Sequence, residues 1–188
     1  MQAIVCIIDS DFSKFRPLIE DSDIIRTDSH DLETMLIESP AFDKVLAEYG
    51  SEAKIANLLA QGRDPRQIVR AAAHPLGILR HYSRVSRLNL VFEGFGLSHV
   101  ERRTLEIDID EMIGHSLRRS RKPPEHHQGA RTYIAMGIGR NHDHWHMCCG
   151  HDLAEIFGLA LQSLLGTQNA TVVRADQIER ALRLVDRI

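Results

Sequence analysis

The sequence predicts an α/β fold with an excess of helix, and three observations carry this prediction. An apolar run at residues 3–8 is typical of a buried strand in a parallel sheet, and a short second strand is predicted at residues 23–27. Most of the remaining chain spaces its apolar side chains as helices do. The chain has 188 residues, 43% of them hydrophobic, which is enough for one domain with a real core. We therefore expect a single domain over residues 1–188, with a small, mostly parallel sheet flanked by helices.

The first helices are predicted after the second strand. Residues 29–39 follow a Thr-Asp-Ser cluster that can cap an N-terminus, and they carry apolar side chains at helical spacing. Pro40 ends this helix, because proline cannot continue the hydrogen-bonding pattern. Residues 41–59 are amphipathic again, with an interruption near Gly50, and therefore predict further helix.

A strong helix-start signal opens the next element. Asp64 can act as the N-cap, Pro65 suits the first helical position, and Gln67 stands where a capping box needs it. We expect this helix to kink or break at Pro75 and to resume toward Arg87.

The second half of the chain mixes predicted strands and helices. Residues 88–92 and 132–138 are apolar enough for strands, and the basic, proline-containing stretch 120–131 indicates an exposed loop. Further helices are predicted from apolar spacing and capping at residues 109–117, 151–165 and 174–188.

Composition limits the classes of function. The formal net charge of −3 gives no global attraction to nucleic acid, so a polyanion would need a local basic patch. Three cysteines, Cys6 and the adjacent Cys148 and Cys149, cannot form an ordinary disulfide framework, which favours a reducing cytoplasm. No apolar stretch approaches the roughly 20 residues that span a bilayer, so we expect neither membrane insertion nor secretion.

Two carboxylates, Asp9 and Asp11, follow the first predicted strand directly. Ligands of open α/β sheets collect outside the carboxyl ends of the strands, and paired acids repel unless a cation lies between them. Oxygen ligands suit Mg²⁺ or Mn²⁺. Asp31 and Glu33 follow the second strand and can share this metal. The structural alternative is that these acids cap turns and stabilise helix N-termini.

The order of these motifs resembles a known bacterial family. Strand, Asp-x-Asp, strand, Thr-Asp-x-His-Asp-Leu-Glu (Thr27 to Glu33) and a late Gly150-His151-Asp152-Leu153 are similar to an uncharacterised family with a Toprim-like fold. That family is related to the nuclease domains of the overcoming-lysogenisation-defect proteins. The resemblance covers nearly the whole chain, and it implies a divalent-metal site in which Asp9, Asp11 and Glu33 are ligands.

The resemblance also implies a glutamate on a strand upstream of the Asp-x-Asp strand. Met1 already lies at that strand, so the first βα unit of the pattern is missing from this sequence. A truncated chain, a partner that supplies the missing acid, and an inactive remnant are the three explanations that follow.

A second cluster of chemically active residues lies between residues 141 and 152. If the segment is extended, alternate side chains share one face, and imidazoles with thiolates can build a zinc site. The candidate ligands are His142, His144, His146, Cys148 and Cys149. The alternative is an edge strand that leads into a turn where His151 and Asp152 cap a helix. The resemblance implies that this turn faces the cleft formed by Asp9, Asp11 and Glu33. There, His151 can contact a phosphate and Asp152 can assist in binding a cation.

A basic stretch offers a possible nucleic-acid contact. Cations in a flexible segment can bind the phosphate backbone without reading sequence, although most such runs are only solvated. The candidate residues are Arg118, Arg119, Arg121 and Lys122, and Arg80, Arg84 and Arg87 recur nearby at helical spacing.

Two classes of function follow from these observations. The first is a Toprim-like, metal-dependent nuclease, truncated or weakly active, that acts with an ATPase partner in defence against phage, as the resemblance implies. The chain has no Walker motif of its own. The second is a non-catalytic interaction module that binds a partner ATPase or nucleic acid. The sequence leaves DNA or RNA as substrate and the oligomeric state open.

Overall fold

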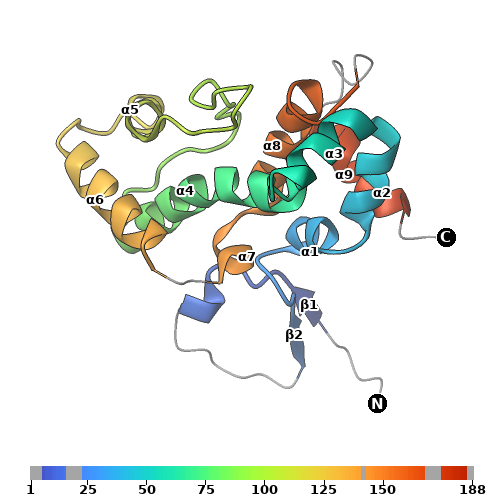
Figure 1. Cartoon of the computed structure of the whole chain (residues 1–188). Helices are drawn as coiled ribbons and strands as arrows, with labels where there is room; N and C mark the ends of the chain where they lie inside the picture. Colours follow the sequence, from blue (N-terminus) through green and yellow to red (C-terminus); the bar gives the residue numbers. More distant parts are fainter. Residues whose placement is uncertain (1–5, 16–22, 141–142, 168–174, 186–188) are drawn as a thin grey trace.

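A small parallel sheet stands at one end of a helical body. The structure, a computed structural model, describes residues 6–15, 23–140, 143–167 and 175–185 (Figure 1). Strand β1 (Cys6–Ile8) pairs in parallel with β2 (Ile24–Arg26), with Ile7 opposite Ile25. The predicted class, helix-rich α/β with a small parallel sheet, is therefore confirmed. Residues 3–5 of the predicted first strand lie outside the described residues.

The two strands are less buried than predicted. Ile7 is 72% exposed and Ile25 is 53% exposed. Side chains of paired residues point to the same face of a sheet, so these two isoleucines stand together on an uncovered face. The prediction of a buried first strand was wrong for the described residues, because Cys6 and Ile7 are exposed and Ile8 is only half-buried.

The helices of the first half follow the predictions closely. They are α1 (Leu32–Glu38), α2 (Ala41–Tyr49), α3 (Glu52–Ala60) and α4 (Pro65–Val85), and they follow a single 3₁₀ turn, η1 (Ser13–Phe15). The predicted break at Pro75 was wrong, because α4 is one helix of 21 residues. Packing against α6 and α8 on either side holds α4 continuous through the missing amide of Pro75.

The second half is more helical than predicted. It contains α5 (Ile109–Arg119), α6 (His126–Ile138), α7 (His144–Met147), α8 (Gly150–Gln162) and α9 (Ala175–Val185). The strand predicted at residues 132–138 belongs to α6, and residues 88–92 form no strand. Ala130, Ile134 and Gly137 bury one face of α6 at helical spacing, which a short apolar run does not distinguish from a strand. The exposed loop predicted at residues 120–131 is shorter than predicted, because α6 begins at His126.

Helix α4 crosses the middle of the molecule between two buried clusters (Figure 1). One cluster joins α4 to α1, α2, α8 and α9, and its Phe42 and Phe157 rings stack at 4.3 Å. The other cluster joins the second half of α4 to α5, α6 and the chain around Leu90. Among the described helices, none is both long enough and apolar enough to cross a bilayer.

Candidate metal centre

Three loops meet at the carboxyl end of the sheet: the loop after β1, the loop after β2, and the segment around α7. The backbone N–H of Asp11 donates to the His30 carbonyl at 2.7 Å, and the N–H of His30 donates to the Trp145 carbonyl at 3.2 Å. The N–H of Ser10 donates to the Thr27 hydroxyl at 2.8 Å. Asp11 adopts a φ of 45°, in the left-handed region that aspartate tolerates better than most residues. These bonds hold the acidic loop against the helical body.

Asp31 joins the starts of α1 and α8. One of its carboxylate oxygens accepts the Thr34 amide at 2.8 Å and the Thr34 hydroxyl at 2.7 Å, and the other accepts the Gly150 amide at 2.9 Å. A Cβ on Gly150 would lie 2.3 Å from an Asp31 oxygen, so only glycine fits here. Asp31 is thus a helix cap in this structure, and its predicted part in metal binding stays a prediction.

The acids that follow the two strands influence one another electrostatically. Burial raises the pKa of Asp9, and the negative charges of Asp31, Asp11 and Glu33 raise it further, while His30 acts in the opposite direction. The acids predicted from the sequence therefore do gather at one edge of the sheet. Their mutual repulsion is the condition under which a bound cation is favourable.

Two arginines already approach this acidic edge. Arg183 of α9 is hydrogen-bonded to Glu33. Arg84 of α4 lies 3.6 Å from a carboxylate oxygen of Asp11, and both side chains are about half exposed. Glu33 is therefore paired in the absence of metal, whereas Asp11 is held loosely.

The structure adds His30, which the sequence interpretation did not assign to the site. Its Nδ1 lies 2.9 Å from the His146 carbonyl, which can only accept, so Nδ1 carries a proton and Nε2 is the nitrogen left to bind a cation. That Nε2 is 3.8 Å from an Asp11 oxygen. Ligand atoms of His30, Asp31 and Cys149 also lie within 4.8 Å of one another, so they form a possible metal-binding group. Burial raises the pKa of the Cys149 thiol to about 12, so it would bind metal only after losing a tightly held proton.

The predicted histidine and cysteine cluster separates into different environments. Residues 144–147 form a helix, so the extended alternation does not occur there. The His144 ring packs against His74 at 4.1 Å, and His146 Nδ1 is 2.9 Å from an Asp143 oxygen. Cys148 is fully buried, and His142 lies outside the described residues. Within the described part of the chain, Cys149 is the member of this cluster that joins a metal-capable group.

His151 and Asp152 start α8 but face different partners. Asp152 is buried and accepts two hydrogen bonds from the Arg80 guanidinium, both at 2.6 Å. His151 is more exposed, and its Nδ1 lies 3.0 Å from a Glu179 oxygen. The buried Asp152 is therefore paired with Arg80, and the predicted contacts of both residues with phosphate or cation stay predictions.

The predicted basic patch lies away from the acidic edge. Arg118 and Arg119 end α5, and Arg121 and Lys122 follow it, on the far side of α4 from the sheet (Figure 1). Arg118 is hydrogen-bonded to Glu111 at 2.9 Å. The structure thus brings the arginines of α4 and α9 to the acids, not those of α5.

A scan against protein-family models and searches of curated proteins and solved structures found no match to this chain. The class that the fold defines is helix-rich α/β with a two-stranded parallel sheet in its described part. The Toprim-like assignment stays a prediction, and the functional argument depends on the geometry of the acidic edge.

Proposed function

We propose that this chain is a metal-dependent phosphodiester hydrolase, a Toprim-like nuclease, whose site is the acidic edge of the sheet. The observation that carries the proposal is the gathering of four carboxylates, Asp9, Asp11, Asp31 and Glu33, at one edge of the sheet, close enough for the other three to raise the pKa of Asp9. Carboxylates that repel one another lower the stability of the fold, and such clusters are typical of sites that bind a cation. The ATPase partner and the role in phage defence that the resemblance implies belong to the same proposal.

The donor types at the acidic edge would suit a divalent cation. Among the described residues, however, only the ligand atoms of His30, Asp31 and Cys149 already lie within 4.8 Å of one another. Asp9 and Asp11 would therefore have to turn toward His30. Asp9 and Asp11 would supply oxygen ligands, and His30 would supply its Nε2 lone pair. Two carboxylates with one imidazole suit Mn²⁺ better than Mg²⁺, because Mg²⁺ takes oxygen ligands almost exclusively. Glu33 would join this set only by giving up its bond to Arg183.

Residues near the acidic edge would have separate roles in hydrolysis or in holding the site. A bound cation would supply Lewis acidity to the phosphate and acidify an attacking water. Arg84, loosely paired with Asp11, would turn to a phosphate oxygen of the substrate. His30 would stay fixed by the His146 carbonyl, so its free nitrogen keeps its direction. Asp31 would hold the surrounding loops through its two helix starts.

A thermal-shift titration with Mn²⁺ tests the metal site. At a concentration 100 times Kd, the cation should stabilise the fold by about 2.7 kcal/mol, or raise Tm by roughly 5–10 °C. Asp9→Asn should abolish this rise and the cleavage of a nucleic acid substrate. Because the pKa of Asp9 is raised, its ionised form destabilises the folded chain at neutral pH, so Asp9→Asn should also increase Tm in EDTA.

Glu48→Gln is the matched control. Glu48 is an exposed acid on α2, so its removal takes away one charge without touching the sheet edge. It should keep both the Mn²⁺ response and the cleavage. A parental Mn²⁺ response and parental cleavage in Asp9→Asn would refute the assignment.

A non-catalytic interaction module is the second candidate. The contacts that favour it are the arginine partners of Glu33 and Asp11, which neutralise these acids without any cation. An unchanged Tm in Mn²⁺ and Mg²⁺, together with an absence of cleavage by the parental chain, would support this module and exclude the nuclease.

A further inference from the structure

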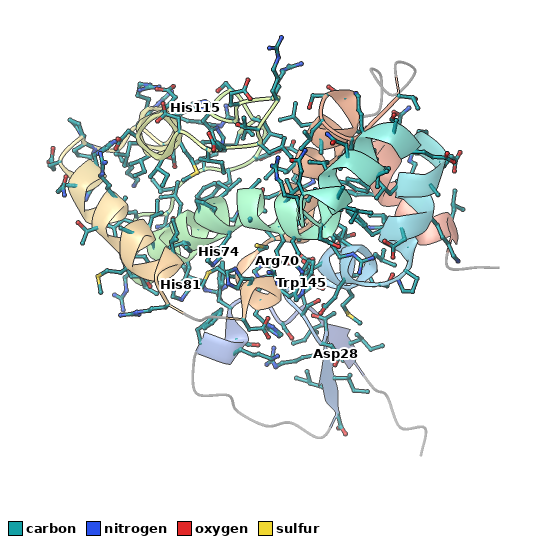
Figure 2. All side chains as sticks on the ribbon, in the orientation of Figure 1. Asp28, Arg70, His74, His81, His115 and Trp145 are labelled. Atoms are coloured by element: carbon teal, nitrogen blue, oxygen red, sulfur yellow. The ribbon has the colours of Figure 1, made fainter. Side chains whose placement is uncertain are left out.

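A pocket of about 280 Å³ lies beside the acidic edge, where η1, the second half of α4, α6 and α7 come together. Figure 2 shows His81 at this meeting point, near the end of α6. The lining includes three rings, two thioethers and one cation, from Phe15, His81, Tyr133, Met136, Met147 and Arg140.

The rings form a connected wall. The Tyr133 hydroxyl is hydrogen-bonded to His81 Nδ1 at 2.8 Å, and the two ring centroids are 5.9 Å apart. The Phe15 ring meets His81 at 5.6 Å. The rings are inclined to one another by 61° and 36°, so they give the pocket an angled aromatic lining that a planar ring can contact, and the thioethers adapt to its outline.

The charge of the pocket is the opposite of the charge of the chain. Arg140 is the charged residue among the described lining residues, and none of them is an acid, although the whole chain carries a net charge of −3. A planar ring attached to an anionic group matches both the wall and this cation.

One phenyl ring connects the pocket to the acidic edge. The Phe12 ring contacts both the His81 ring, at 5.1 Å between centroids, and the His30 ring, at 4.8 Å. Phe12 also follows Asp11 directly in the chain. The pocket and the proposed metal ligands are therefore neighbours across the width of a single side chain.

We propose that this pocket binds an unpaired nucleobase of a single-stranded nucleic acid whose phosphate lies at the acidic edge. The proposal depends on the proposed function, because that function supplies the phosphate. The volume of about 280 Å³ lies just below the usual range for ligand pockets, about 300–1,000 Å³, and suits one base and not a longer segment. A base in a duplex cannot reach such a wall, whereas an unpaired base stacks on it. Arg140, at the pocket, contacts the neighbouring phosphate of the strand.

Binding in EDTA tests the pocket independently of catalysis. The probes are a short single-stranded oligonucleotide and a fully abasic strand of equal length, with Kd measured by fluorescence anisotropy. The parental chain should bind the strand with bases at least about fivefold more tightly, as expected for base–aromatic stacking. Measuring Kd for both probes as RNA and as DNA shows which of the two nucleic acids the pocket prefers.

Variants of Tyr133 and Arg140 locate the binding. Tyr133→Leu should remove the preference for bases, whereas Tyr133→Phe, which keeps the ring, should retain it. Arg140→Gln should lower the salt dependence by about one phosphate contact. Arg63→Gln is the control, because Arg63 is an exposed cation in the turn between α3 and α4.

Two results would overturn the pocket. They are equal affinity of the parental chain for the strands with and without bases, and a parental preference for bases in Tyr133→Leu. Because EDTA prevents metal-dependent cleavage, these results do not bear on the proposed hydrolase activity, which the Mn²⁺ titration tests separately. Conversely, a chain that fails the Mn²⁺ test and still prefers bases through Tyr133 retains the base pocket and loses the hydrolase.

Discussion

Replacing Gly150 with alanine should loosen the junction that supports the acidic edge. A new Cβ would lie 2.3 Å from an Asp31 oxygen and 2.6 Å from the Thr34 amide nitrogen, so α1 and α8 would have to move apart. Overpacking of this kind costs about 1–3 kcal/mol, and a weakened Asp31 cap costs about 1 kcal/mol. The better helix propensity of alanine returns at most about 1 kcal/mol. We therefore expect a net loss of roughly 2 kcal/mol, or about 4–8 °C in Tm.

Gly114→Ala supplies the matched comparison for this experiment. Gly114 lies within α5, and a Cβ there would meet only the mobile end of the Arg118 side chain, at 3.0 Å. Its stability should be unchanged or higher by up to about 1 kcal/mol. Urea and thermal unfolding of the two variants measure the difference. If Gly150→Ala unfolds at the parental Tm or above Gly114→Ala, the close approach of the two helix starts is not as the structure has it.

Two further predictions concern buried charge. Burial and the nearby His115 lower the pKa of His99 to about 4 from its ordinary 6.5, so between these values the unfolded chain binds more protons than the folded one. The free energy of unfolding should thus fall by up to about 3 kcal/mol as pH drops from 6.5 to 4. Urea unfolding of His99→Gln should show a smaller fall over this pH range. A fall equal to that of the parental chain would show that His99 is not responsible. Asp152→Ala should cost up to about 3 kcal/mol by leaving the guanidinium of the half-buried Arg80 unpaired, and the double variant Arg80→Met, Asp152→Leu should recover most of this loss; equal losses in the two variants would contradict the pairing.

The elements that the sequence predicted well are those with local signals. Asp64 and Asp108 accept hydrogen bonds from amides three residues later, so the starts of α4 and α5 depend on nearby residues alone. The strand predicted at residues 132–138 failed for the opposite reason. Its apolar side chains suit both periods, and the packing of α6 against α4, distant in sequence, selects the helix.

The candidate site shows the same division between local and distant information. Asp9 and Asp11 could be found because they directly follow a strand. His30 could not, because the carbonyl that fixes its ring belongs to His146, 116 residues away. The pairing of Glu33 with Arg183 spans 150 residues and was equally hidden. The only sequence signal was the position of His30 between Thr27 and Asp31. This position indicates a role at the site only when the structure shows that the three loops lie together.

The positive φ of Asp11 determines which substitutions can be interpreted. Alanine at this position would force a side chain with no local hydrogen bond into left-handed backbone, and that strain costs of order 1–3 kcal/mol on its own. An inactive alanine mutant would therefore confound a lost carboxylate with a distorted turn. Asparagine tolerates the same dihedral angles and differs by a single atom, and so it separates chemistry from conformation at this residue.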